Sequence, residues 1–235
     1  MSTGLRERRK QETRLRISDV ATQLFTERGF DEVTISQVAE AAGVSKMTVT
    51  NYFARKEDLV FDRAEGLIAH LAEVITGRKP GESMLAAVRR DYAEAIARAD
   101  VTLGLSTPEF ARMITSSPAL IDRGLEMMAQ RETALAEAIM ADTGRNAEGT
   151  EGTEGTEGAE GAGVQGAEGA RAEGALQPRL VAALLAAAHR VLAQEATRRS
   201  LAGEPRPQIC AALADLSGQA FDLLEPSIGS YGIRA

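Results

Sequence analysis

The 235-residue chain has no tryptophan, a single cysteine and only two histidines. One cysteine, Cys210, excludes a disulfide framework and is typical of a reducing compartment. His70 and His189 are far apart and have no cysteine partners at zinc spacing, and the sequence contains no phosphate loop or nucleophile elbow. We therefore expect no catalytic residue, no metal and no cofactor.

Long apolar runs are also missing. The longest, Leu180 to Ala188, is too short to span a bilayer, and the charged N-terminus does not look like a signal peptide. These observations predict a cytoplasmic protein without a membrane partner. Aromatic residues make up 4% of a chain rich in Ala, Leu and Glu, which favours an all-α fold.

The net charge of −7 argues against a general coat for nucleic acid. The charge is polarised, however. Residues 1–60 hold ten basic and nine acidic residues and so carry +1, which leaves −8 on the rest. Six basic residues fall within residues 1–16, and we expect residues 1–9 to be a flexible basic arm.

The stretch from Thr34 to Phe53 reads as two short helices joined by a tight turn. Thr34 and Gln37 form a capping box, Gly43 suits the end of the first helix, and Ser45 caps the second. Apolar positions at helical spacing predict one anchored face, while the other face is small and polar. Such a face suits a DNA major groove, although an ordinary helical hairpin with a solvated face gives the same pattern.

The amino-acid sequence of this stretch resembles that of the TetR (tetracycline-repressor) family of bacterial regulators. The matching residues are Thr34, then 42–45 (AGVS), 48–53 (TVTNYF) and 56–59 (KEDL). Two positions depart from the family pattern: Met47 stands where many members have Gly, and Thr50 where Tyr is usual. Both lie on the expected DNA-facing side, so the operator sequence does not carry over.

The resemblance implies a homodimeric, ligand-responsive repressor that binds a pseudo-palindromic operator and is released by a small molecule. It also implies a two-part fold: an N-terminal three-helix DNA-binding domain with the helix-turn-helix, and a C-terminal helical domain for ligand binding and dimerisation. The alternative is a helical small-molecule-binding or enzymatic domain with a vestigial helix-turn-helix. DNA binding by this chain would separate the two.

Residue chemistry assigns roles within the motif. Lys46 suits guanine edges and Asn51 adenine, while Met47 and Thr50 can touch a thymine methyl group. Lys56 opens the next expected helix and is predicted to contact a phosphate. Family position adds Ser36. The full predicted DNA-binding set is Thr34, Ser36, Ser45, Lys46, Met47, Thr48, Thr50, Asn51, Tyr52 and Lys56.

Breaks in the apolar pattern suggest the domain limits. We expect a DNA-binding domain over residues 10–56, a connecting helix over 57–77, an effector-binding and dimerisation domain over 78–225 and a tail over 226–235. Within the second domain, residues 144–175 contain ten of the 22 glycines and seven glutamates. That composition predicts a disordered acidic loop.

The resemblance places the effector site among the middle helices. The expected lining is largely aliphatic and thioether in character, which favours a largely apolar ligand: Leu67, His70, Leu71, Tyr92, Phe110, Arg112, Met113, Met127, Met128 and Arg131. In the family the last two long helices form the dimer interface, although here they could simply complete the core. The residues expected there are Leu180, Leu184, Ala187, Val191, Leu213, Leu216, Ala220 and Leu223.

Overall fold

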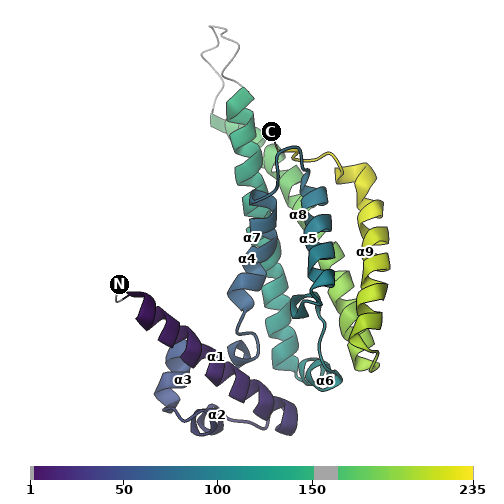
Figure 1. Cartoon of the computed structure of the whole chain (residues 1–235). Helices are drawn as coiled ribbons and strands as arrows, with labels where there is room; N and C mark the ends of the chain where they lie inside the picture. Colours follow the sequence, from purple (N-terminus) through teal and green to yellow (C-terminus); the bar gives the residue numbers. More distant parts are fainter. Residues whose placement is uncertain (1–2, 151–163, 235) are drawn as a thin grey trace. The chain divides into compact units, whose positions relative to one another are not determined.

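The computed structural model describes residues 3–150 and 164–234, with side chains described over 6–144 and 176–234. All regular structure in those residues is helical, which confirms the all-α prediction (Figure 1). The elements are α1 (Thr3–Arg28), α2 (Ile35–Ala41), α3 (Lys46–Tyr52), the 3₁₀ turn η1 (Glu57–Leu59), α4 (Ala64–Thr76), α5 (Met84–Ala97), the 3₁₀ turn η2 (Val101–Leu103), α6 (Pro108–Ser116), α7 (Pro118–Thr150), α8 (Val164–Leu201) and α9 (Arg206–Ile228).

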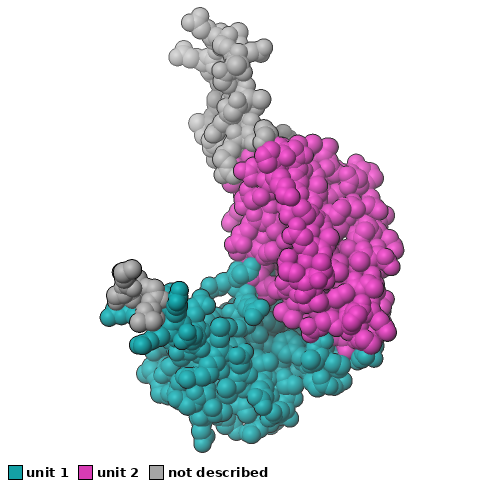
Figure 2. Space-filling view, in the orientation of Figure 1, with its two compact units in different colours: residues 1–66, 106–127, 201–203 teal, residues 67–105, 128–200, 204–235 magenta. Residues whose placement is uncertain are grey.

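The chain divides into two compact units (Figure 2). Unit 1 consists of residues 1–66, 106–127 and 201–203, and unit 2 of residues 67–105, 128–200 and 204–235. Helices α6 and the start of α7 therefore belong with the N-terminal unit. The sequence had placed the whole of 78–225 in one second domain, because a break in the apolar pattern does not show which core a later helix joins.

The core of unit 1 is built on α1, which contacts α2, η1 and α6. Ile17, Ala21 and Phe25 follow one another at four-residue spacing on one face of α1, and all three are fully buried. The rings of Phe25 and Phe30 meet edge to face with centroids 4.9 Å apart. This core fixes the orientation of the helix-turn-helix, which is the part of the unit that presents polar residues outward.

Unit 2 is a helical bundle in which α5 packs along α9, together with α4, α7 and α8 (Figure 1). Its core is largely aliphatic, with Leu71, Leu135, Leu185 and Leu213 fully buried. Burial at this scale stabilises by about 1.5–3 kcal/mol per large side chain. The bundle is thus held together by apolar burial, and a few polar side chains are buried within it.

Arg78 ties the end of the chain into unit 2. Its guanidinium has no exposed surface, pairs with Asp142, and donates to the carbonyls of Ile75 and Gly232. The backbone of Arg234 exchanges hydrogen bonds with Gly81 and Glu82. The expected tail at 226–235 is therefore wrong: α9 continues to Ile228 and the residues after it pair with the start of α5.

Two boundaries near the N-terminus also differ from expectation. Residues 3–9 are the first turns of α1 instead of a flexible arm, because most of them are Leu, Arg or Glu, which are good helix formers. The single connecting helix expected over 57–77 is interrupted between η1 and α4. The hydroxyl of Ser18 donates a 3.0 Å hydrogen bond to the carbonyl of Leu59. A continuous helix would use that carbonyl as an acceptor for one of its own amides.

The acidic segment differs at both ends from the predicted loop over 144–175. Helix α7 continues to Thr150 and α8 begins at Val164, so the residues flanking the repeat extend the two long helices. Adding a residue to an existing helix needs no new nucleus, which makes glycine tolerable there at about 1 kcal/mol each. The central repeat, residues 151–163, lies outside the described residues.

Candidate nucleic-acid interface

The first helix of the motif begins and ends as its sequence predicts. At the N-terminus the hydroxyl of Thr34 accepts from the Gln37 amide at 3.3 Å, and the Gln37 side chain accepts from the Thr34 amide at 2.8 Å. At the C-terminus Gly43 has φ +65°. Its amide donates to the carbonyl of Glu40, and the amide of Val44 donates to the carbonyl of Ala39. This pair of bonds is a Schellman motif, which needs a left-handed residue and so favours glycine.

Helix α3 starts two residues later. The hydroxyl of Ser45 accepts from the amide of Thr48 at 3.0 Å, which caps the helix. Val49 and Phe53 anchor its inner face in the unit 1 core with 0% and 4% of their surface exposed. Fixing the inner face in this way leaves the outer face of α3 with one defined orientation.

The outer face carries the residues expected to read bases. Lys46, Met47, Thr50 and Asn51 are all exposed, and Met47 keeps 69% of its surface in solvent despite being apolar. Among the residues that the structure describes, Lys46 and Asn51 make no side-chain hydrogen bond or ion pair, and neither does Ser36 on α2. These three side chains therefore keep their hydrogen-bonding capacity for an external partner.

The other hydroxyls of the predicted set are engaged locally. Thr34 and Ser45 cap their helices, and Thr48 shares a 2.8 Å hydrogen bond with Ser45. The Thr50 hydroxyl turns back onto the carbonyls of Lys46 and Met47 at 3.3 and 3.1 Å. Because its hydroxyl is engaged, the methyl group of the exposed Thr50 is the part left for the expected contact with a thymine methyl.

Lys56 has a different setting from the one predicted. Its ammonium donates to the carbonyl of Phe30 and lies 4.2 Å from the centre of the Phe30 ring and 5.5 Å from that of Phe25. Burial lowers its pKa, against the opposing effect of Asp31. It also precedes a short 3₁₀ turn instead of a long helix. These contacts favour a structural role over the predicted phosphate contact.

Arg14 holds the motif against the segment that follows it. Its guanidinium donates to the carbonyl of Tyr52 at 2.9 Å and of Asp62 at 3.2 Å, and lies 4.7 Å from the ring centre of Phe53. The half-buried Tyr52 remains beside this contact, at the end of α3.

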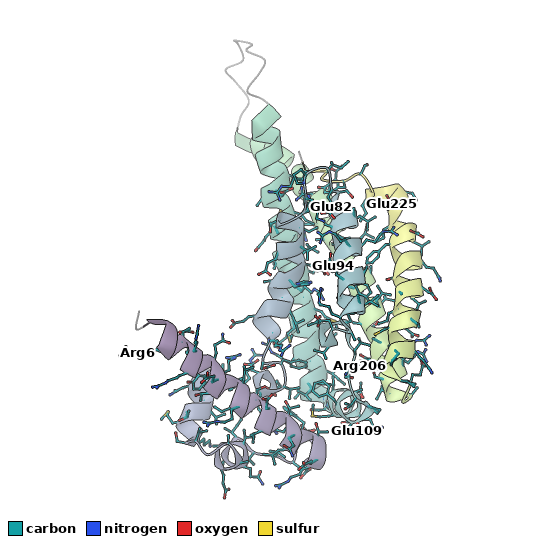
Figure 3. The ribbon with its side chains drawn as sticks, viewed as in Figure 1. Arg6, Glu82, Glu94, Glu109, Arg206 and Glu225 are labelled. Atoms are coloured by element: carbon teal, nitrogen blue, oxygen red, sulfur yellow. The ribbon has the colours of Figure 1, made fainter. Side chains whose placement is uncertain are left out.

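The N-terminal turns of α1 present a basic surface that the arm prediction did not anticipate. Arg6, Arg9 and Lys10 are exposed on the helix, and Figure 3 shows Arg6 projecting from its first turns. A helical arrangement places these charges at fixed intervals of about 1.5 Å per residue along the axis. The signal was present in the sequence as a run of helix-forming charged residues.

The predicted effector-lining residues do not gather in one unit. Phe110, Arg112, Met113 and Met127 belong to unit 1. Phe110 and Met113 pack against that unit's core, and Arg112 pairs with Glu109 on its surface. The six in unit 2 are Leu67, His70, Leu71, Tyr92, Met128 and Arg131. Of these, His70, Tyr92 and Arg131 share a polar cluster with Asp91 and His189, two residues that the sequence did not assign to a site.

The predicted dimer residues divide between surface and core. On α8, Leu180, Leu184 and Val191 are 53%, 38% and 58% exposed, and Leu223 on α9 is 80% exposed. Ala187, Leu216 and Ala220 are partly buried. Leu213 is fully buried in the unit 2 core, so its side chain is absent from the surface that an interface would use.

Other kinds of site find little support in the part of the chain that the structure describes. No group of three or more His, Cys, Asp or Glu side chains there could hold a metal ion. None of the helices in those residues combines the length and apolar character needed to cross a membrane.

The capped helix pair, its anchored inner face and its exposed polar face define a helix-turn-helix DNA-binding protein. Residues 17–62 match the family model described as bacterial regulatory proteins, tetR family. These residues therefore form a DNA-binding domain of the TetR type. The recognition made from the motif residues is thereby confirmed.

Regulators of other bacteria are similar to this chain over part of their length. The chain is 27% identical to the transcriptional regulator TcmR of Streptomyces glaucescens over 146 residues, which span 60% of this chain and 65% of TcmR. It is 43% identical over 49 residues to MftR of Mycobacterium tuberculosis, a putative mycofactocin biosynthesis regulator, spanning 21% of this chain and 25% of MftR. Less than two thirds of either relative is therefore matched.

A solved structure shares the fold. A TetR-family regulator from Mesorhizobium loti is 21% identical, with a TM-score of 0.50, and the match covers 92% of this chain and 98% of the other. At that identity the likeness concerns the fold alone. The division into a helix-turn-helix domain and a helical second part agrees with it.

Proposed function

We propose that this regulator is a homodimeric repressor that binds a pseudo-palindromic operator through α2 and α3 and leaves it when a small molecule binds in unit 2. The observation that carries the proposal is the outer face of α3. Lys46 and Asn51 are exposed there, and their polar groups have no partner among the described residues. Amide and ammonium groups in this setting match adenine and guanine edges of the major groove.

A second copy of the chain is the partner that the α8 surface supports. Leu176, Leu180, Leu184 and Val191 are exposed at helical spacing along one face, while Leu185 and Leu192 are buried on the opposite face. The inner face of α8 already packs into the core, and its outer face carries a second apolar stripe. Such an exposed stripe is typical of an interface. Two symmetric copies would present two α3 helices to two half-sites.

The test begins with DNA. A gel shift on the segment flanking the chain's own gene, followed by sequencing of genomic fragments selected by binding, should give a two-fold symmetric site. Asn51→Ala should weaken that site by about 1–3 kcal/mol, whereas Glu137→Gln, an exposed change in unit 2, should not. Absence of DNA binding, with ligand binding retained, would favour the alternative of a small-molecule-binding or enzymatic domain with a vestigial helix-turn-helix.

The mass of the chain in solution tests the dimer separately. Val191→Glu should convert dimers to monomers in analytical ultracentrifugation, because the charge would be buried between copies. Arg190→Glu introduces the same side chain beside it, off the stripe, and should leave the dimer intact. A monomeric parent chain would remove the stripe from any role in assembly between copies.

A further inference from the structure

A group of polar side chains from four helices meets inside unit 2. The Nε2 atom of His70 on α4 lies 2.8 Å from Oδ2 of Asp91 on α5. Nη2 of Arg131 on α7 lies 3.1 Å from Nδ1 of His189 on α8, and the His189 ring meets Tyr92 edge to face with centroids 5.1 Å apart. The bundle thus brings five hydrogen-bonding groups together beside a core that is otherwise largely apolar.

Three atoms of this cluster are buried and have no hydrogen-bond partner among the described residues: Oη of Tyr92, Nε of Arg131 and Nε2 of His189. Tyr92 and His189 are 1% and 7% exposed. Buried polar groups are nearly always paired, so three together indicate a place where a partner from outside the chain is expected.

The contact between Arg131 and His189 fixes what these atoms can do. A guanidinium only donates, so Nδ1 of His189 must be the acceptor. Burial keeps the pKa of His189 well below its usual range, so the ring is neutral and its one proton is on Nε2. The unpartnered atoms of Arg131 and His189 are therefore both N–H donors.

Tyr92 adds a third donor. Burial raises the pKa of its hydroxyl, so the hydroxyl keeps its proton at neutral pH. Burial also lowers the pKa of Arg131 to about 10, which still leaves the guanidinium charged. Arg131, His189 and Tyr92 thus present three unpartnered donors, one of them on a buried cation. A hydrogen-bond acceptor is what this site lacks.

The number of charges limits the kind of acceptor. Among the described residues, Arg131 is the cation that contacts His189, and the nearby carboxylate of Asp91 is already hydrogen-bonded to His70. A single guanidinium matches a monoanion such as a carboxylate, and a phosphate dianion would leave one charge uncompensated in the interior. Val88, Leu135 and Leu185 lie one helical turn from Tyr92, Arg131 and His189, and all three are buried, so the neighbourhood of these polar groups is aliphatic.

We propose that Arg131, His189 and Tyr92 anchor the carboxylate of a hydrophobic monocarboxylic acid, and that such an acid is the effector. This inference rests on the proposed function for its regulatory meaning, but binding itself does not depend on DNA. It refines the largely apolar ligand expected from the sequence by giving that ligand an acidic end.

Binding to the full chain is tested with two acids and their neutral analogues. Decanoate and 1-naphthoate are compared with 1-decanol and 1-naphthol by thermal shift and titration calorimetry. At least one acid should raise the melting temperature and bind about tenfold or more tightly than its alcohol, since a hydrogen bond to a charged group is worth that much. Equal affinity of acid and alcohol, or no response to either acid, would overturn the proposal.

Substitutions identify the anchor. Tyr92→Phe removes a hydroxyl that has no partner within the described residues, so it should fold like the parent while binding the acid several-fold more weakly. Arg131→Met should abolish the preference for the acid over the alcohol. Glu137→Gln on the same helix is exposed and should bind like the parent. Parental affinity in both Tyr92→Phe and Arg131→Met would exclude this cluster as the site.

Measuring acid binding and operator release separately distinguishes this inference from the regulatory proposal. If the acid binds but does not release the operator in a gel shift, the anchor stands and the effector role fails. If the operator is bound and no acid binds, the DNA-binding function stands and the anchor fails.

Discussion

Arg78 and Asp142 form a two-pronged ion pair in which Nη1 lies 3.1 Å from Oδ1 and Nη2 lies 2.5 Å from Oδ2. The guanidinium is fully buried and the carboxylate is 13% exposed. Because Arg78 also donates to the carbonyls of Ile75 and Gly232, it connects the loop after α4, the middle of α7 and the C-terminal segment.

Removing Arg78 should therefore be costly. Arg78→Ala is expected to lower the free energy of unfolding by about 3–5 kcal/mol, because a buried carboxylate loses its cation and two carbonyls lose their donor. Urea unfolding measures this loss. Arg89→Ala breaks contacts to the exposed Asp222 and Glu225 and should cost about 0–1 kcal/mol, which makes it the matched control. Equal losses in the two variants would show that burial of the Arg78 pair adds nothing.

The two histidines should act on stability in separate pH ranges. The hydrogen bond to Asp91 raises the pKa of His70 above 6.5, with Glu73 adding to this and burial and Arg131 opposing it. Its stabilising effect is complete below pH 6.5 and is lost as pH rises through the raised pKa. Burial, with Arg131 and His70, lowers the pKa of His189, so its effect is present above pH 6.5 and is lost as pH falls.

Urea unfolding across pH checks these signs. His70→Asn should remove the decline of stability above pH 6.5, and His189→Asn should remove the decline below it, whatever each substitution does to stability itself. A parental profile that rises steadily through this range, with both variants parallel to it, would contradict the assignment.

Lys56 offers a test of structural against phosphate roles. Lys56→Ala should lower the free energy of unfolding by about 1–2 kcal/mol, because it loses a hydrogen bond and a partly buried cation–π contact. The slope of log affinity against log salt should stay at the parental value. A slope reduced by about 0.9 per half-site would restore the phosphate contact predicted from the sequence. Lys10→Ala, an exposed change on α1, serves as the reference for stability.

Thr50 is expected to contribute to base reading. Thr50→Tyr introduces the residue usual in the family at an exposed position, so it should change the preferred operator while shifting stability by only about 0.5 kcal/mol. Selection of bound fragments, together with thermal melting, compares the two effects. An unchanged selected sequence would mean that Thr50 does not contact bases.

The acidic segment should be dispensable for folding. Deleting residues 147–172 removes the facing ends of α7 and α8 together with the connection between them, and loop closure changes by only about 0.6 kcal/mol for each doubling of length. The core side chains described on α7 end at Ile139, and those on α8 begin again near Val181. We expect dimer mass, melting temperature and operator affinity close to those of the parent chain. Monomers or a large fall in melting temperature would mean that the segment supports the fold.

The helix-turn-helix could be predicted almost residue by residue because its determinants are local. The Thr34 cap, the Gly43 turn and the Ser45 cap each depend on neighbours within about five positions, and all three are confirmed. Helices α5 and α6 were predictable for the same reason, since Ser83 and Thr107 cap them.

What the sequence could not show depends on distant contacts. Arg14 binds the carbonyl of Asp62 and Arg78 that of Gly232, and no local pattern records such pairs. The polar cluster of unit 2 has the same origin: His70, Tyr92 and Arg131 were predicted from family position. Asp91 and His189 joined them only once four helices were packed together, because helical spacing gives the face of a helix and not its neighbour.

The conformation of Thr50 has a consequence for chemically modified DNA. With its hydroxyl bonded back to Lys46 and Met47, Thr50 presents a methyl group, and the exposed Met47 beside it is also apolar. In the major groove 5-methylcytosine carries its methyl group where thymine does. A reader of this kind would distinguish methylated from unmethylated cytosine at the contacted base pair, so the methylation state of the host genome would become part of the operator.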